Sequence, residues 1–324
     1  MSTSEQNHPK YLSIEIGGTK LQLGIGTGNG ILEGQIRAGV EVKKGAEGIR
    51  QQIIQLIPDL LSQMNLNIRA IRGIGIGFGG PLDSKQQKII KSHQILGWDD
   101  FPISEWLSNQ VQKPVVAGND ADVAGLAEAH FGAGKGASPI FYITVGSGIG
   151  GGFIIDGQIY QGVGRGAAEI GHLQLGPLFS SEMISASNNL EVLEKRASGW
   201  GIASHAQRLL NDPNITSPQV WLLADQNNRA AQQVIGAALD ALALAICQVI
   251  ALLCPARIVI GGGVSLIGEK HFFEPIRDRV EKWVFPPFRD LFQIVPAALG
   301  EEVVLHGGIA LAKYHFESPL KRLA

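Results

Sequence analysis

The densest run of chemically useful residues lies near the middle of the chain. An apolar, β-rich run at Ile140–Val145 leads into a glycine-dense turn at Gly146–Gly152, and a second β-rich run follows at Phe153–Ile155. Glycine lets the backbone approach a ligand closely and present bare N–H groups, which suits a phosphate. Shortly afterwards, Glu169 and His172 place a carboxylate beside an imidazole. This segment therefore predicts phosphoryl transfer to a polyol.

Two other interpretations of the glycine-dense turn need to be considered. Gly146, Gly148 and Gly151 fit the spacing of a dinucleotide-binding loop, but that motif requires a helix directly after the loop. A strand is predicted here instead, so we exclude a dinucleotide site. A glycine-rich β-hairpin without a ligand stays open as the plain alternative.

A second candidate group lies where a strand predicted at Lys113–Ala117 runs into a helix predicted at Ala121–Phe131. Asn119 offers an amide that can orient a hydroxyl, and Asp120 offers a carboxylate that can accept its proton. The dipole of the following helix would keep Asp120 ionised. A simpler role for Asp120 is to cap that helix, and the sequence leaves both roles open.

The N-terminal part of the chain repeats the strand, glycine turn and strand pattern. Strands are predicted at Tyr11–Ile16 and Leu21–Ile25, on either side of Gly17 and Gly18. The repetition indicates an internal duplication, in which each half supplies a phosphate-facing hairpin. The side chains predicted to act at this turn are Thr19 and Lys20, as donors to a nucleotide phosphate, and Glu15, holding a magnesium-bound water.

Further strands end in glycines that have no obvious role in a hairpin. A strand at Gly73–Phe78 ends in Gly79 and Gly80, and a strand at Arg257–Ile260 ends in three glycines, Gly261–Gly263. Strand ends form the binding crevice in open α/β sheets, and bare glycines let an adenine-ribose unit lie against the backbone. The alternation of strands and helices predicts two doubly wound α/β halves facing a cleft.

The last part of the chain carries weaker signals. Val303-Val304 predicts a short final strand and His306–His315 a helix. The run Ala241–Cys254 is the most apolar one, and we interpret it as a core helix that is too short to span a membrane. Cys247 and Cys254 both fall within it and are predicted to be buried.

Composition narrows the class of protein. The 324 residues are 45% hydrophobic and 17% charged, which is typical of a folded α/β protein. The net charge of −2 provides no electrostatic case for binding nucleic acid or a membrane surface. Two cysteines imply no disulfide framework, and the polar N-terminus lacks the apolar core of a signal peptide. We therefore expect a cytoplasmic protein.

Taken together in order, these motifs resemble those of the ROK family, which contains sugar kinases, related repressors and uncharacterised relatives. The resemblance covers nearly the whole chain, from about Tyr11 to His315. The runs that carry it are Glu15–Lys20, Gly75–Asp83, Leu96-Gly97-Trp98, Asn119-Asp120-Ala121, Gly146–Gly152, Glu169-Ile170-Gly171-His172 and Ile260–Gly263.

The resemblance implies the actin-like ATPase fold of hexokinases and ribonuclease H, with two lobes around a cleft. Residues 1–118 would form one α/β lobe, completed by a C-terminal helix at about 307–324, and residues 119–306 the other. ATP and Mg²⁺ would be used. The residues implied to contact the nucleotide are Gly17, Gly18, Thr19, Lys20, Gly146, Ser147, Gly148, Gly261, Gly262 and Gly263.

The resemblance also implies roles in the sugar site. Asp120 would be the base that accepts the proton of the sugar hydroxyl during its attack on the γ-phosphate. The residues implied to hold the sugar are Gly79, Gly80, Asn119, Glu169, His172 and Glu194. For Glu194, a commoner role is that of an exposed carboxylate on a helix, and this alternative stays open.

One departure from the family pattern concerns metal. ROK proteins usually carry three cysteines that bind zinc together with the histidine matching His172. Here Ser185, Ser187 and Val192 align with those positions, and neither serine nor valine replaces a thiolate as a zinc ligand. We therefore predict no structural zinc, with Met183–Val192 held by packing and hydrogen bonds.

These observations favour an ATP-dependent hexose kinase that converts glucose to glucose 6-phosphate. The alternatives are a kinase for fructose, mannose or an N-acetylhexosamine, the use of polyphosphate as donor, and a non-catalytic sugar sensor. Repressors of the family add a helix-turn-helix domain, and about ten residues before the first strand are too few for one. A homodimer is an expectation by analogy with relatives.

Overall fold

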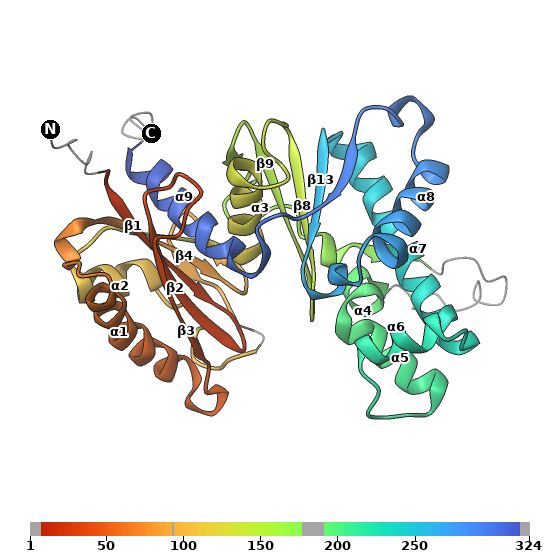
Figure 1. Ribbon diagram of the computed structural model, residues 1–324, viewed down its shortest axis with the longest axis horizontal. Coiled ribbons are helices and arrows are strands. Elements are labelled where there is room, and N and C mark those ends of the chain that lie inside the picture. Colours follow the sequence, from red (N-terminus) through yellow and green to blue (C-terminus); the bar gives the residue numbers. More distant parts are fainter. Residues whose placement is uncertain (1–7, 93, 177–190, 318–324) are drawn as a thin grey trace, which may run out of the picture. The chain divides into compact units, whose positions relative to one another are not determined.

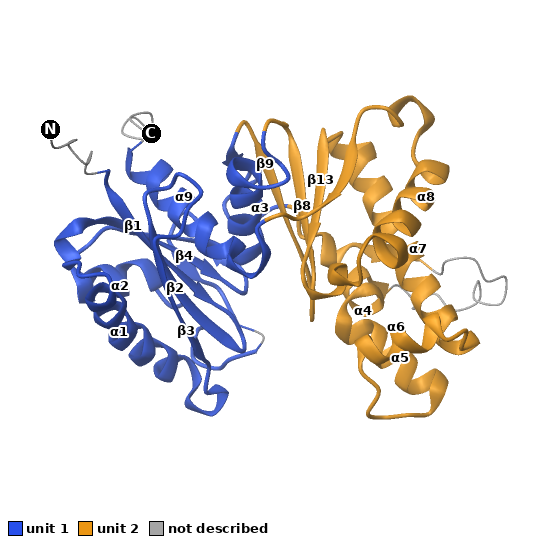
Figure 2. Ribbon diagram, in the orientation of Figure 1, with its two compact units in different colours: residues 1–135, 157–167, 299–324 blue, residues 136–156, 168–298 orange. Residues whose placement is uncertain are grey.

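The computed structural model describes residues 8–92, 94–176 and 191–317 (Figure 1). By contacts, the chain divides into two compact units (Figure 2). Unit 1 comprises residues 1–135, 157–167 and 299–324, and unit 2 comprises residues 136–156 and 168–298. The boundary expected after residue 118 stays a prediction, and by contacts residues 119–135 group with unit 1.

Within the described residues, unit 1 contains a five-stranded sheet in the order β3-β2-β1-β4-β7. Strands β1 and β2 form an antiparallel hairpin, whereas β1, β4 and β7 run parallel to one another. The carboxyl ends of parallel strands meet at one edge of a sheet, which is where ligands bind in open α/β folds. The five strands are β1 (Lys10–Ile16), β2 (Lys20–Gly26), β3 (Gly34–Gly39), β4 (Ile71–Phe78) and β7 (Val115–Asn119).

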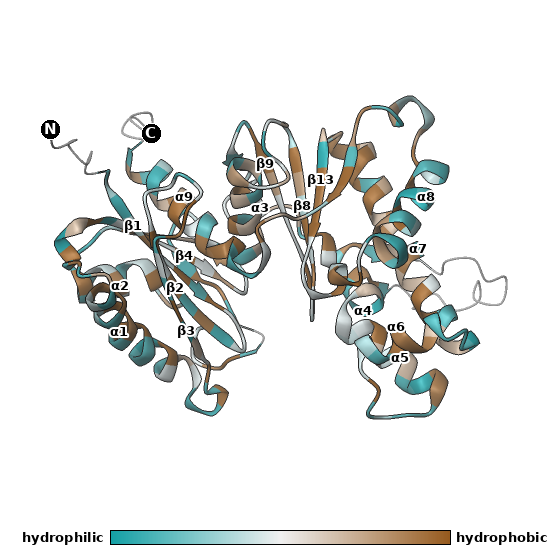
Figure 3. Cartoon of the chain, in the orientation of Figure 1, coloured by the Kyte–Doolittle hydropathy of each residue, from teal (hydrophilic) through white to brown (hydrophobic). Residues whose placement is uncertain are grey.

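Helices cover both faces of this sheet (Figure 1). The strand residues Leu12, Ile14 and Ile16 share a core with helices α1 and α2, while Tyr11 packs with α9 on the other face, as the period of a strand requires. Teal and brown alternate along α1 in Figure 3, as expected for an amphipathic helix. The helices are α1 (Gly45–Gln63), α2 (Ile103–Val111), α3 (Asp120–Phe131) and α9 (Val303–Glu317), and a small hairpin joins β5 (Leu82–Asp83) to β6 (Lys88–Ile89).

The C-terminal helix α9 lies unusually close to its neighbours because glycines meet at the contact. A Cβ on Gly307 would lie 1.9 Å from the carbonyl oxygen of Val123 on α3, and a Cβ on Gly75 of β4 would lie 1.9 Å from that of Gly308. The strand predicted at Val303-Val304 is wrong, because α9 begins at Val303. Two β-branched residues indicate a strand only weakly, and packing on the sheet decides for the helix.

Unit 2 repeats the arrangement of strands seen in unit 1. Strands β8 and β9 form an antiparallel hairpin, and β8, β13 and β14 run parallel, in the order β9-β8-β13-β14. A hairpin followed by two parallel strands in each unit agrees with the predicted internal duplication. The strands are β8 (Ile140–Val145), β9 (Ile149–Ile155), β13 (Arg257–Gly261) and β14 (Gln293–Pro296), with short strands β11 (Gln174–Leu175) and β12 (Glu191–Val192). The short strand β10 (Gln158–Ile159) falls within the residues of unit 1.

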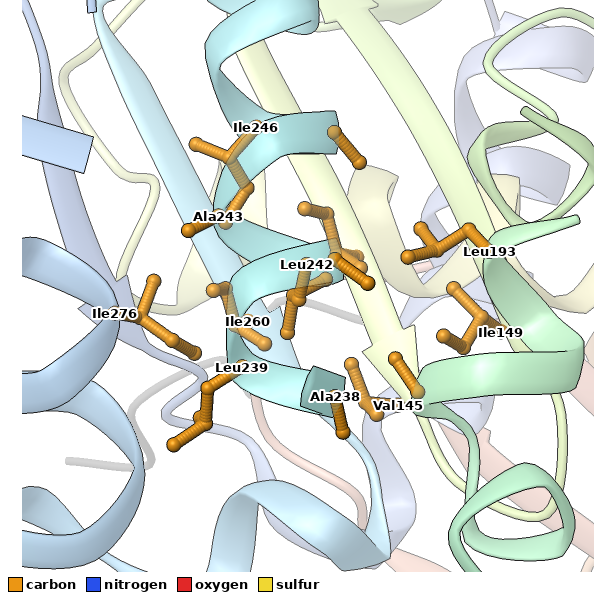
Figure 4. Close-up of a cluster of buried hydrophobic side chains, with 14 of the residues drawn as sticks. Val145, Ile149, Leu193, Ala238, Leu239, Leu242, Ala243, Ile246, Ile260 and Ile276 are labelled. Carbon is orange, nitrogen blue, oxygen red and sulfur yellow. The ribbon is translucent and has the colours of Figure 1, made fainter. Parts of the chain in front are cut away.

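Helix α7 (Arg229–Leu253) is the centre of the unit 2 core. Its residues Leu242 and Ile246 lie with Val145, Ile149 and Ile260 of the sheet in one buried cluster (Figure 4). The surrounding helices are α4 (Leu193–Ala197), α5 (Gly199–Leu210), α6 (Ser217–Asp225) and α8 (Glu274–Trp283).

Two expectations about the apolar run in α7 need correction. The helix has 25 residues and a mean hydropathy of 2.2 in its most apolar window, so by length and composition it is able to span a membrane. Burial, and not length, therefore carries the argument for a core helix: 67% of that window is buried. Cys247 is buried as predicted, but Cys254 is exposed, because it lies just beyond the end of α7.

Candidate active site

The candidate base lies where β7 ends and α3 begins. Asn119 caps α3, and its Oδ1 accepts a hydrogen bond from the N–H of Ala121 at 2.9 Å. Its Nδ2 donates to the carbonyl oxygen of Gly80 at 3.1 Å. The interpretation of Asp120 as the helix cap is therefore wrong: Asn119 is the cap, and Asp120 is the first residue of the helix.

The Asp120 carboxylate is held at the edge where the parallel strands end. Its Oδ1 accepts from the N–H of Ala121 at 2.8 Å, and its Oδ2 lies 3.4 Å from where a Cβ on Gly79 would be. Gly79 in turn donates its N–H to the carbonyl oxygen of Ile16, at the end of β1, at 3.0 Å. The first turn of a helix favours a negative charge, which suits a carboxylate at this half-buried position.

Side chains from several segments of unit 1 lie around its glycine turn. Lys20 Nζ lies 3.1 Å from Glu15 Oε1, and Gln22 Nε2 donates to Glu15 Oε2 at 2.8 Å. A Cβ on Gly18 would lie 1.4 Å from Oε1 of Gln94, so the Gln94 side chain covers this glycine. Gln94 was not predicted to lie here, and a lone Gln in a connector carries no sequence signal for such a contact. A phosphate at this turn requires the flexible Gln94 side chain to move.

The buried Glu15 makes stability depend on pH. Only 7% of Glu15 is exposed, and burial raises the pKa of its carboxyl, although Lys20 and Gln22 partly oppose the shift. A group with a raised folded pKa contributes stability below its unfolded pKa and loses it as pH rises through the folded pKa. We therefore expect Glu15→Gln to gain stability relative to the wild type as pH rises from about 4 to about 8.

Urea unfolding at both pH values measures this difference. Glu105→Gln, which removes an exposed carboxylate from the first turn of α2, serves as the matched control and should follow the wild type. Parallel stability curves for Glu15→Gln and the wild type would contradict the expectation.

In unit 2, the turn between β8 and β9 is shorter than predicted. Strand β9 begins at Ile149, so the glycines at 150–152 belong to the strand and the turn is confined to Gly146–Gly148. Gly262 adopts a φ of +88°, and a Cβ on it would lie 2.6 Å from the backbone of Val145. The glycine run that follows β13 therefore packs against the end of β8, which brings the two glycine-rich segments together.

Glu194 lies against the same turn. Its Oε2 accepts from the N–H of Ile149 at 2.8 Å and lies 2.4 Å from where a Cβ on Gly148 would be. The side chain is half-buried, so its interpretation as an exposed helix carboxylate is wrong. The N–H of Gly199, at the start of α5, also bonds to the carbonyl oxygen of Gly146 at 2.8 Å. Residues of two helices, α4 and α5, therefore form hydrogen bonds with the segment that joins β8 to β9.

Three predicted sugar-binding residues interact electrostatically within unit 2. Partial desolvation raises the pKa of the Glu169 carboxyl, the nearby His172 lowers it, and the carboxylate of Glu194 raises it. The short 3₁₀ helix Ile170–His172 directly follows Glu169, and the N–H of His172 donates to the carbonyl oxygen of Glu169 at 3.0 Å. Two carboxylates and an imidazole in one group offer several acceptors and a donor for hydroxyls.

The predicted site residues thus fall into one group in each unit. Unit 1 holds Gly17–Lys20, Gly79, Gly80, Asn119 and Asp120, and unit 2 holds Gly146–Gly148, Glu169, His172, Glu194 and Gly261–Gly263. The segment that aligns with the family's zinc ligands lies outside the described residues at Ser185 and Ser187, while Val192 ends β12. Among the residues that the structure describes, no group of three His, Cys, Asp or Glu side chains is placed to hold a metal.

Comparison with known proteins decides the family. The sequence profile of the ROK family matches residues 11–315. The chain belongs to the ROK family. The glucokinase of Halalkalibacterium halodurans is 30% identical to it over 316 residues, which cover 94% of each chain.

Solved ROK structures share the fold. The ROK hexokinase of Thermus thermophilus superposes with a TM-score of 0.82 at 26% identity, covering 95% of this chain and 99% of that one. A ROK glucokinase of Streptomyces griseus in complex with glucose and AMPPNP superposes with a TM-score of 0.74 at 25% identity, covering 94% and 99%. The predicted fold class, the actin-like ATPase fold, is confirmed.

ROK relatives of this chain also include regulators. The xylose repressor of Caldicellulosiruptor bescii is 24% identical over 85% of this chain and 70% of the repressor. Membership of the ROK family therefore establishes the fold and a relationship to sugar kinases, while the reaction has to be argued from the residues of this chain.

Proposed function

We propose that this chain transfers a phosphoryl group from ATP to a hexose, with glucose as the first candidate. The observation that carries the proposal is the Asp120 carboxylate, which lies in the first turn of α3 beside Gly79 at the ends of the parallel strands. A sensor has no need of a base at this position, whereas a kinase needs one to accept the proton of the attacking hydroxyl.

Phosphoryl transfer depends mainly on positioning and on charge neutralisation. In the proposed reaction, Asp120 accepts the hydroxyl proton, and the N-terminus of α3 keeps its carboxylate ionised beforehand. Asn119 caps the helix and so fixes the backbone from which the Asp120 side chain extends, and its second amide hydrogen is proposed to meet the sugar. Glu169, His172 and Glu194 are proposed to hold further hydroxyls.

The nucleotide is proposed to bind the glycine turns. Apart from atoms of the adjacent residues in the chain, no heavy atom lies within 4 Å of where a Cβ on Gly146 or Gly263 would be, so the backbone at both positions has room for a ligand. In unit 1, Gly17–Lys20 is proposed to meet the phosphates once Gln94 moves aside. Mg²⁺ would neutralise charge on the phosphate oxygens, and Glu15 is the acidic side chain proposed to hold one of its waters.

The choice of sugar and donor is a separate question. Fructose, mannose, an N-acetylhexosamine and a polyphosphate donor remain competing candidates, because epimers are separated by a few placed hydrogen-bonding groups. A non-catalytic sugar sensor is the alternative from a different functional class, and relatives named as repressors favour it.

A coupled assay of ADP release with ATP and magnesium tests the proposal. The panel would contain glucose, mannose, fructose and N-acetylhexosamines, with Asp120→Asn as the inactive control. Turnover on one sugar that is lost in the variant would support the kinase and identify its substrate. Sugar binding by calorimetry without turnover on any member of the panel, with ATP or polyphosphate, would favour the sensor.

Purified protein is expected to contain no stoichiometric zinc. The only cysteines of the chain are Cys247 and Cys254, so no thiolate is available at the positions that align with the family's zinc ligands. Elemental analysis after gel filtration measures the metal content. One zinc per chain would show that the alignment of Ser185, Ser187 and Val192 with those ligands is wrong.

Two further properties are proposals that rest on the family. We expect the protein to act in the cytoplasm, where ATP and its sugar substrate are available, and to form a homodimer. Fractionation and sedimentation measure these two properties directly.

A further inference from the structure

The last turn of α3 carries a carboxylate that is fully buried. Glu128 is 0% exposed, and both of its oxygens accept backbone hydrogen bonds: Oε2 from the N–H of Ala133 at 2.7 Å and Oε1 from the N–H of Leu299 at 2.9 Å. A buried charge is costly unless hydrogen bonds replace its hydration, so these bonds help the carboxylate to be buried. A carboxylate offers two acceptor oxygens, whereas the amide of glutamine offers only one.

The two N–H groups lie where the chain passes between the units. The chain leaves unit 1 after residue 135, returns at residue 157, leaves again after residue 167 and returns at residue 299. Leu299 is the first residue of the last return, and Ala133 lies two residues before the first exit. Glu128 therefore holds two of these connections through contacts made within unit 1.

A second side chain of the same helical turn holds a third connection. His130 Nε2 lies 2.9 Å from the carbonyl oxygen of Gly157, the residue at which the chain first returns to unit 1. Because a carbonyl oxygen only accepts, Nε2 carries the hydrogen, and Nδ1 pairs with the hydroxyl of Tyr314 on α9 at 3.1 Å. The rings of His130 and Tyr314 also stack, with centroids 4.5 Å apart. One turn of α3 thus holds three of the four connections.

Helix α3 also carries the proposed base. Asp120 is its first residue, while other residues proposed to hold the sugar, such as Glu169, lie in unit 2. One sugar meets both groups only in a suitable orientation of the units, and the range of orientations depends on how the connections are held. We propose that Glu128 and His130 are positioning residues of the sugar site, which act by fixing the connections to the helix of Asp120. This inference rests on the proposed binding of a sugar by both units.

Sugar binding by the full chain, measured by calorimetry, tests this role. The probe is glucose, or the member of the sugar panel that binds most tightly. Glu128→Gln keeps the size of the side chain but turns a donor toward one of the two N–H groups. The variant should raise the Kd for sugar about 3- to 30-fold, because a smaller fraction of the free protein is competent to bind. Where the sugar turns over, KM should rise by a similar factor with little change in kcat.

The neighbouring histidine provides an independent pair of variants. His130→Ala removes the bond to Gly157 and should also raise the Kd for sugar, whereas His130→Gln still offers a donor and should stay close to the wild type. Should Glu128→Gln fail to fold, this pair carries the same test.

Hydrogen exchange followed by mass spectrometry measures the connections directly. Glu128→Gln should speed exchange in peptides that contain Ala133 and Leu299 and leave the peptides of α7 unchanged. Ile53→Ala is the control, because it removes a fully buried side chain from α1, a helix that contains no connection between the units. This control should lower Tm but bind sugar as the wild type does.

The outcomes separate this inference from the proposed reaction. Wild-type affinity for sugar in Glu128→Gln and His130→Ala would overturn the inference alone, and so would an equal loss of affinity in Ile53→Ala. A wild type that binds no sugar of the panel would overturn the inference together with the proposed function. Weaker sugar binding in Glu128→Gln but not in Ile53→Ala, in a protein without turnover, would support the inference while overturning the kinase.

Discussion

Replacing Asp120 with asparagine is expected to lower the turnover of the preferred sugar about 10²- to 10⁴-fold, which is the usual contribution of a general base. The amide keeps the size of the side chain and its hydrogen bond from the N–H of Ala121, but it does not accept a proton at neutral pH. Because the substrates still bind, the KM for sugar should change little, so the loss should fall on kcat.

The control for Asp120→Asn is Glu105→Gln, which removes a carboxylate from the first turn of another helix of unit 1. Steady-state kinetics on both variants, with thermal unfolding to compare their stability, separates a catalytic effect from a loss of helix stability. Normal turnover in Asp120→Asn would remove this residue from the role of base and would leave the proposed reaction without its central observation.

Replacing Gly307 with alanine is expected to destabilise the protein by about 3 kcal/mol, although alanine normally favours a helix over glycine. The new Cβ would lie 1.9 Å from the carbonyl oxygen of Val123, so α9 has to move away from α3. A backbone oxygen cannot rotate aside as a long side chain can. A fall in Tm of roughly 5–10 °C is expected, measured by calorimetry.

Gly236→Ala is the matched control, because it makes the same change in the interior of α7, where no heavy atom outside the adjacent backbone of the helix lies within 4 Å of the new Cβ. This variant is expected to gain about 0.5–1 kcal/mol from helix propensity. The two variants thus predict shifts of opposite sign. Equal stability of Gly307→Ala and the wild type would show that the close approach of α9 and α3 does not occur in solution.

Local patterns in the sequence determined most of the elements that carry the candidate site. The apolar runs before Gly17, Gly79 and Asn119 are strands, because alternating or continuous apolar residues bounded by glycine suit a buried strand. The rejected dinucleotide motif also follows from local sequence, since strand β9 and no helix comes after Gly148. These features depend on neighbours within a few residues, which is the range over which sequence patterns are informative.

The tertiary structure alone decided how the candidate residues are held. Nothing local indicates that Glu194 binds the N–H of Ile149, 45 residues away, or that Gln94 covers Gly18. The start of α9 at Val303 was likewise set by its packing on β1 and β4, against the preference of two valines for a strand. Contacts between segments distant in the chain leave no periodicity in the sequence, and their energy depends on shape and burial that exist only after folding.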